Sequence, residues 1–253
     1  MSFLTRVAGG VSRRLGRPEL LAAVDATARA AQQDALGIAA VLAATLASDD
    51  TYIDIGTNRG QVLREAVRIA PRGKHIAFEP IPALAGEVSA SFPGVECRQM
   101  ALGAKAEVTE FCHFKQLDGW SGLRRRPEIS DERGQPEYIT VNVSTLDAEI
   151  AQLTPRVVKI DVEGAELAVL EGARAALARA RPLVVFEHDP GAAALYDTAP
   201  GAPWDLLNEL GYRIFTVTGE GPFTRAEFVQ ASKIINWLAA PDGTPATASA
   251  AQA

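Results

Sequence analysis

From residue 51 onward, short and almost wholly apolar runs alternate with stretches in which apolar residues recur at helical spacing. Strands are this uniformly apolar when helices cover both faces of a parallel sheet. The runs that predict strands are 51–56, 75–80, 95–102, 156–164, 182–189 and 212–219, and those that predict helices are 61–70, 83–92, 165–177 and 203–211. This alternation predicts a doubly wound α/β fold, with helices on both faces of a mostly parallel sheet.

The pattern departs from strict alternation in two places. Residues 231–240 form an apolar run that follows the strand at 212–219 with no helix between them, which favours an antiparallel last strand. Residues 107–116 and 138–147 also predict strands, and the segment between them is long, polar and rich in Gly, Pro and Arg. Loops of this length in compact domains are usually functional or mobile, so we expect a lid near residues 115–137.

Residues 18–48 are rich in alanine, with leucine and valine at helical spacing, and predict one or two helices before the first strand. We therefore expect three parts: an N-terminal helical arm at 1–48, a main domain at 49–240 and a disordered tail of small polar residues at 241–253. Arginines interrupt the first apolar residues, which does not match a signal peptide. The alanine-rich helices offer a surface on which subunits could pair, so a homo-oligomer is one expectation.

Composition narrows the class of protein. The 253 residues suffice for one large domain, and 47% of them are hydrophobic, enough for a substantial core. A net charge of −6 argues against broad binding of nucleic acid. The sequence has no apolar run of transmembrane length, and its two cysteines, Cys97 and Cys112, do not form a disulfide framework. These features predict a cytoplasmic protein.

The first predicted strand runs into an acidic, glycine-containing turn, in which Gly56 and Gly60 follow Asp54. Glycines permit a tight turn and let a ligand approach the backbone, and the start of the next helix suits an anionic group. A carboxylate at Asp54 suits a ligand with a cationic amine. Glu79 ends the next strand, where a carboxylate can accept hydrogen bonds from a ribose diol. The G-x-x-x-G spacing differs from the G-x-G-x-x-G of dinucleotide-binding folds.

Several segments resemble the motifs of one family. "YIDIGTNRG" (52–60), "AFEP" (77–80) and "KIDVEGAE" (159–166) look like motifs of FkbM-type S-adenosylmethionine-dependent methyltransferases, and "VNVSTLD" (141–147) also fits. The resemblance covers about residues 51–237. It implies a Rossmann-like class I methyltransferase fold, with a seven-stranded sheet and an antiparallel last strand. It also implies S-adenosylmethionine as the cofactor, and methylation of a hydroxyl on a sugar, glycan or small metabolite.

The resemblance also assigns residues to the methyl donor. The amino acid end would lie near Asp54 and the glycine turn, and Glu79 would accept hydrogen bonds from the ribose hydroxyls. The adenine would lie against residues 100–101, which could equally be ordinary core, and the insertion would contact the donor from above. The donor-binding residues would be Asp54, Gly56, Asn58, Gly60, Glu79, Met100, Ala101 and Ser121.

Methyl transfer to an alcohol also requires removal of a proton, which a general base assists. We expect the candidates at the carboxyl ends of the central strands, and they are His188, Asp161 and Glu187. His188 is the preferred base because a histidine with a pKa of about 6.5 can accept a proton near neutral pH, although lone histidines are more often structural.

Two side-chain groups have competing interpretations. In the insertion, Trp120 is expected to stack on the acceptor or donor, whereas the arginines at 124–126 either bind an anion or form a solvated charge run, which we favour. Asp161, Glu163 and Glu187 could together supply the oxygen ligands of a divalent cation. Their spacing in the sequence does not require one, so we predict no metal.

Two alternative functions use the same fold. An NAD-binding oxidoreductase would require a tighter glycine motif without the preceding acid. A non-catalytic nucleotide-binding protein would keep the donor pocket but not the reaction.

Overall fold

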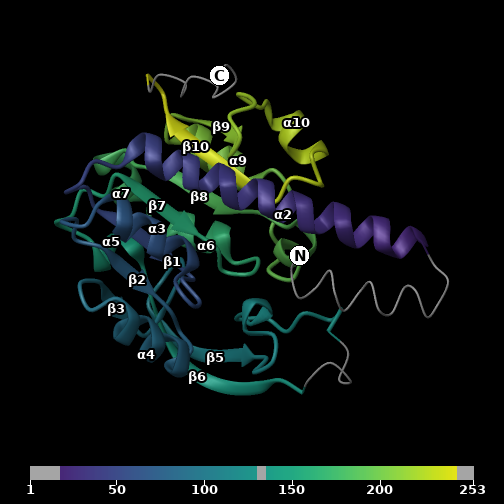
Figure 1. Cartoon of the computed structure of the whole chain (residues 1–253), viewed down its shortest axis with the longest axis horizontal. Coiled ribbons are helices and arrows are strands. Elements are labelled where there is room, and N and C mark those ends of the chain that lie inside the picture. The colour runs from purple at the N-terminus through teal and green to yellow at the C-terminus, as the bar shows by residue number, and fades with distance from the viewer. Residues whose placement is uncertain (1–17, 130–134, 244–253) are drawn as a thin grey trace.

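The structure, a computed structural model, describes residues 18–129 and 135–243. Its centre is a seven-stranded sheet with the strand order β3-β2-β1-β7-β8-β10-β9 (Figure 1). The strands are β1 (Tyr52–Ile55), β2 (Ile76–Phe78), β3 (Glu96–Arg98), β7 (Val157–Ile160), β8 (Leu183–Glu187), β9 (Tyr212–Thr216) and β10 (Asn236–Pro241). The first five listed pair in parallel, and β10 is antiparallel to both β8 and β9. The predicted fold and its antiparallel last strand are confirmed.

Apolar side chains bury both faces of this sheet, as the uniformly apolar strands predict. One core cluster contains Ile53 and Ile55, and the other contains Tyr52, so successive residues of β1 serve opposite faces. The helices of the described chain are α2 (Pro18–Thr45), α3 (Gln61–Ile69), α4 (Pro82–Ser91), α5 (Leu146–Glu149), α6 (Glu166–Glu171), α7 (Arg174–Ala180), α8 (Pro190–Ala194), α9 (Ala202–Glu209) and α10 (Arg225–Gln230).

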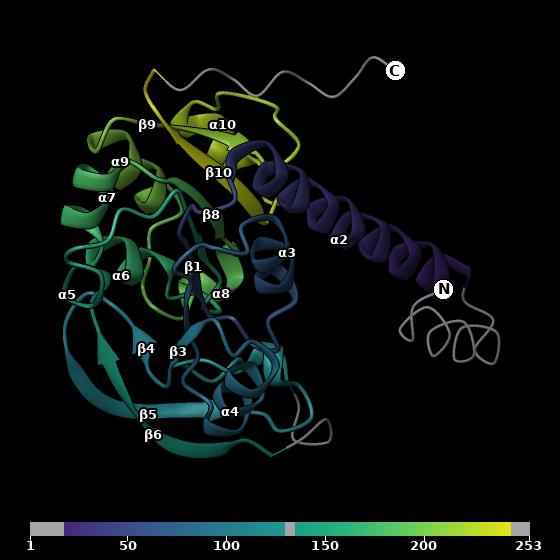
Figure 2. The same cartoon turned by 60° about the vertical axis from the view of Figure 1, so that its left-hand side comes forward.

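A second, three-stranded sheet lies beside the main one (Figure 2). Its strands are β4 (Ala101–Leu102), β5 (Glu107–His113) and β6 (Glu137–Ser144), with β6 in the middle. The run 95–102 was predicted as one strand, but it divides into β3 and β4, which belong to different sheets. The short 3-10 helix η1 (Asp118–Trp120) lies in the insertion between β5 and β6.

In the described part of the N-terminal region, from residue 18, the chain forms the helix α2, whose beginning projects away from the main sheet in Figures 1 and 2. Its second half is not a separate arm, because Ile38, Val41 and Leu42 are buried in the same cluster as Leu63 of α3. Apolar contact with the sheet layer fixes this part of the helix, which has consequences for the cavity described below.

The ends of the chain differ slightly from the predicted boundaries. Pro241 still belongs to β10 and is buried, so the predicted boundary at 241 falls inside the last strand. Residues 244–253 of the predicted tail, residues 1–17 and residues 130–134 of the predicted lid lie outside the described residues. Within the described ranges, none of the helices has the length and apolar character needed to cross a bilayer.

Candidate active site

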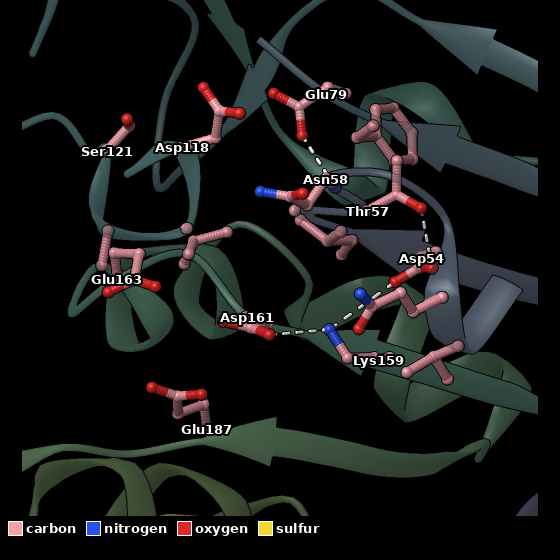
Figure 3. Close-up of a pocket in the computed structure, with 18 of the residues that line it drawn as sticks. Asp54, Thr57, Asn58, Glu79, Asp118, Ser121, Lys159, Asp161, Glu163 and Glu187 are labelled. Atoms are coloured by element: carbon pink, nitrogen blue, oxygen red, sulfur yellow. Dashed lines mark hydrogen bonds and ion pairs between the residues drawn. The ribbon is translucent and has the colours of Figure 1, made fainter. Parts of the chain in front are cut away.

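A cavity of about 890 Å³ lies at the carboxyl ends of β1, β2, β7 and β8 (Figure 3). This is the edge at which open α/β sheets bind ligands. Helix α2 and the insertion around η1 form further walls. Asp34 of α2 also accepts a hydrogen bond from Asn236 Nδ2 of β10 (3.0 Å), which ties the helix to the sheet beside the cavity.

The strand register gathers five ionisable side chains on one face of the sheet. Asp54 of β1 lies opposite Lys159 of β7. Ala77 of β2 and Val185 of β8 lie in the same row across the sheet. Because alternate side chains of a strand point to the same face, the residues two positions after this row reach the same cavity. They are Glu79 after β2, Asp161 after β7 and Glu187 at the end of β8, and all five line the cavity.

The turn between β1 and α3 takes the shape that its glycines allow. Gly56 has φ of 76°, and a Cβ there would lie 1.8 Å from the carbonyl oxygen of Asp161, so no other residue fits. Asn58 and Gly60 also have positive φ, of 50° and 70°. The Asn58 N–H donates to Glu79 Oε2 (2.9 Å), which fixes the turn against the next strand.

Asp54 lies at the base of the cavity with 1% of its surface exposed. Its Oδ2 accepts a hydrogen bond from Thr57 Oγ1 (2.9 Å). Its Oδ1 is buried and has no hydrogen-bond partner among the described residues. Burial raises the pKa of Asp54, and the Lys159 ammonium acts in the opposite direction. An unsatisfied buried carboxylate oxygen is costly, so Asp54 is suited to receive a cationic hydrogen-bond donor.

Glu79 is held by backbone groups on both of its oxygens. Oε2 takes the Asn58 N–H and Oε1 takes the Ile81 N–H (2.9 Å each). Burial raises the pKa of Glu79 to about 7, although these two hydrogen bonds oppose the change. A carboxylate oxygen has two lone pairs, so each oxygen keeps one acceptor position for a ligand such as a ribose diol.

Lys159 is a cavity residue that the sequence analysis missed. It has 7% of its surface exposed, and its Nζ lies 2.9 Å from Asp161 Oδ2 and 3.8 Å from Asp54 Oδ1 (Figure 3). Burial alone would lower the pKa of Lys159, but the carboxylates of Asp161 and Asp54 raise it above its ordinary value. A lysine inside the apolar run of a central strand was the available signal, because lysines are almost never fully buried without a partner.

The insertion is anchored over the cavity by Arg126. Its guanidinium pairs with Glu163 (2.5 Å) and Asp189 (3.4 Å), and lies 5.0 Å from the ring centroid of Trp120. Arg126 is buried. The preferred interpretation of the arginines as a solvated charge run is therefore wrong for this residue, because its partners come from loops distant in sequence.

Three carboxylates converge at the side of the cavity opposite Glu79 (Figure 3). Oxygen atoms of Asp161, Glu163 and Glu187 lie within 4.8 Å of one another. Burial and the Asp161 charge raise the pKa of Glu163 to about 8 and that of Glu187 to about 9. Because Lys159 and Arg126 already neutralise two of these groups, the arrangement does not favour a divalent cation.

The family model of the methyltransferase FkbM domain matches residues 54–214, more than half of the chain. The chain belongs to the FkbM methyltransferase family. The matched region begins at Asp54 and includes both the turn after β1 and the carboxylate cluster. The family indicated by the sequence motifs is confirmed.

Similar proteins of known name include a methyltransferase, sdnD of Sordaria araneosa, which is 29% identical over 51% of this chain and 62% of its own length. The antimetabolite synthetase AmbE of Pseudomonas aeruginosa is 27% identical over 67% of this chain, but only 10% of its own length. The chain thus spans less than two thirds of either relative. Among solved structures, the FkbM methyltransferase of Methylobacillus flagellatus is similar with a TM-score of 0.48 and 15% identity, over 77% of this chain and 44% of that one.

In this member of the FkbM family, His188 does not line the cavity. It follows Glu187 directly, so its side chain points to the opposite face of the sheet. Its ring stacks on Phe228 at 5.4 Å between centroids, and Nε2 has no hydrogen-bond partner within the described ranges. Burial lowers the pKa of His188. The structure therefore does not place His188 where a base for methyl transfer is needed.

Most of the other predicted donor residues line the cavity, and Gly60 does not. Met100 and Ala101 line it, and so does Ser121, although Ser121 Oγ already accepts the N–H of Phe114 (3.0 Å). Asp118 is a further lining residue that the sequence analysis did not identify. It pairs with Arg59 of the glycine turn (2.7 Å), and thereby joins the insertion to the predicted donor site.

Proposed function

We propose that this methyltransferase uses S-adenosylmethionine to methylate a hydroxyl on a sugar, glycan or small metabolite. The observation that carries the proposal is that Asp54 and Glu79 both line the cavity, on either side of the glycine turn. One offers an unsatisfied buried oxygen and the other keeps free acceptor positions, at the carboxyl ends of neighbouring strands.

These residues fit the donor at both ends of the molecule. Asp54 Oδ1 would receive its ammonium, and the backbone N–H groups of the Gly56–Gly60 turn would face its carboxylate. Glu79 would accept the ribose hydroxyls, and Met100 and Ala101 would contact the adenine. When bound, the donor supplies an electrophilic methyl group on a positively charged sulfur. The acidic character of the cavity suits that charge.

The carboxylate cluster would serve the acceptor. Asp161 and Glu187 line the side of the cavity away from Glu79. Asp161 carries a Lys159 ammonium on one oxygen, and its other oxygen can accept the hydroxyl proton. Glu187, with a pKa raised to about 9 by burial and by its acidic neighbours, is protonated at neutral pH and can donate a hydrogen bond to orient the acceptor oxygen.

A labelled-methyl screen against hydroxylated sugars and metabolites tests the proposal. The parent protein should transfer label to at least one hydroxyl. Asp161→Asn should bind the donor normally but transfer at least about 100-fold more slowly, as expected for loss of a general base. Glu171→Gln, on an exposed position of α6, is the matched control and should behave as the parent. Label found on nitrogen, or equal rates in parent and Asp161→Asn, would contradict the proposal.

A further inference from the structure

We infer that Lys159 is a positioning residue that connects the two halves of this site. Its ammonium holds Asp54, on the donor side, and Asp161, on the acceptor side, in one chain of alternating charges. This inference rests on the proposed function, because it assigns the two carboxylates to donor and acceptor.

The geometry of the sheet produces the chain of charges. Lys159 lies opposite Asp54 in the β1–β7 register, and Asp161 follows it by two residues on the same face. The ammonium thus lies between two carboxylates, at 2.9 Å from Asp161 Oδ2 and 3.8 Å from Asp54 Oδ1 (Figure 3). No rearrangement of the strands is needed to bring the three groups together.

The two distances have different consequences. At 2.9 Å, the ammonium forms a hydrogen bond to Asp161 and fixes the orientation of that carboxylate. At 3.8 Å, it is too far from Asp54 for a hydrogen bond, yet close enough to stabilise the negative charge. The Lys159 ammonium therefore lowers the pKa of Asp54, against the effect of burial, while Oδ1 remains available to the ammonium of the donor.

A purely structural role explains Lys159 less well. Its neighbours on the same face, Val157 and Val185, are apolar and fully packed. Replacing a buried ion pair with apolar residues of similar volume is often neutral or stabilising, so packing alone does not require a lysine here. Without Lys159, moreover, the negative charges of Asp54 and Asp161 would lose the cation of β7 that lies beside them, and other acidic side chains of the cavity lie close by.

The main test compares the parent with Lys159→Met, which keeps the length of the side chain and removes the charge. Donor affinity, measured by calorimetry with S-adenosylmethionine, should fall at least tenfold. With saturating donor, kcat should fall at least 100-fold, while KM for the acceptor should change less than threefold. Lys105→Met removes an exposed lysine paired with Glu107 and should match the parent in every respect. A Lys159→Met protein whose donor affinity and kcat lie within twofold of the parent would overturn the inference.

If Lys159→Met does not fold, the charge-balanced pair Asp54→Asn/Lys159→Met takes its place. If Lys159 acts through Asp54, the double variant should bind the donor no more weakly than Asp54→Asn alone. If the two residues act independently, their separate losses of donor affinity would multiply in the double variant, and this result would refute the connection.

A third measurement does not depend on the donor. NMR titration of protein labelled with ¹³C at the aspartate carboxyls should show a higher pKa for Asp54 in Lys159→Met than in the parent, because the Lys159 ammonium lowers the pKa of Asp54. If the parent ignores S-adenosylmethionine, the proposed function fails, but this titration still decides whether Lys159 acts on Asp54. An Asp54 that titrates at the same pH in parent and Lys159→Met would refute the inference by itself.

Discussion

Replacing Glu166 with glutamine should stabilise the protein by an amount that grows as the pH rises. Glu166, the last residue of the "KIDVEGAE" motif, has 1% of its surface exposed. Its Oε1 accepts the N–H groups of Val162 (3.1 Å) and Gly164 (3.0 Å), and so shapes the loop after β7. Its Oε2 has no hydrogen-bond partner in the part of the chain that is described. Glutamine can keep the acceptor while removing the charge.

The size of the effect follows from proton linkage. Burial raises the pKa of Glu166 from 4.5 to about 7 in the folded protein. The unfolded chain therefore loses this proton at lower pH than the folded protein does, and stability falls as the pH rises between these two values. From pH 5.5 to pH 8.5, this loss amounts to about 2 kcal/mol, and Glu166→Gln should avoid it.

Urea denaturation of both proteins at pH 5.5, 7 and 8.5 measures this difference. Glu163 and Glu187 titrate near this interval, and the Glu166 charge is one of the causes that raise their pKa, so Glu166→Gln lowers the pKa of both and adds to the stabilisation at high pH. Glu171→Gln, in the same helix but exposed, should show no pH-dependent gain. A stability difference between Glu166→Gln and the parent that stays constant with pH would refute the reasoning.

Three further results are expected. Gly56→Ala should lose more than about 3 kcal/mol of unfolding free energy, because its Cβ would meet the Asp161 carbonyl at positive φ, whereas Gly94→Ala has open space and should lose little in the same urea assay. Donor affinity should be about tenfold weaker at pH 6 than at pH 8, because the pKa of Glu79 is about 7 and its charged form accepts the ribose hydroxyls. The Glu79→Gln variant should show no such pH dependence when calorimetry measures its donor affinity. His188→Phe should keep the methyl-transfer rate within threefold of the parent, since its ring packs away from the cavity, and a large loss would return His188 to the mechanism.

The sequence was informative wherever a local rule determines the structure. Uniformly apolar strands alternating with helices predicted the sheet, and the absence of a helix before the last strand predicted its direction. Asp54 and Glu79 could be identified because the sequence order alone shows which acidic residues lie near the ends of predicted strands. Their convergence on one cavity follows from the parallel register.

The missed residues depend on contacts between distant segments. Lys159 and Arg126 become buried through partners on other strands and loops, and only the arginines had been assigned a place, as a solvated charge run. The error on His188 has a simpler cause. His188 directly follows Glu187, the last residue of its strand, and its N–H still donates to the Ile235 carbonyl (2.7 Å). Alternation of side chains would therefore have excluded one of these two neighbours from the cavity.

The donor site also has a wall that the sequence did not reveal. Residues of α2, among them Asp34 and Ile38, line the cavity, although the helix was predicted as a separate arm. Amphipathic spacing predicts that a helix packs, but it does not identify the surface against which it packs.

The central claim is that Asp54 and Glu79 hold S-adenosylmethionine across the glycine turn, and calorimetric titration of the donor tests it most directly. The parent should bind one donor per chain and ignore NAD, and Asp54→Ala and Glu79→Ala should each weaken binding at least tenfold while remaining folded. A folded parent that shows no heat of binding with S-adenosylmethionine at millimolar concentration would contradict the account.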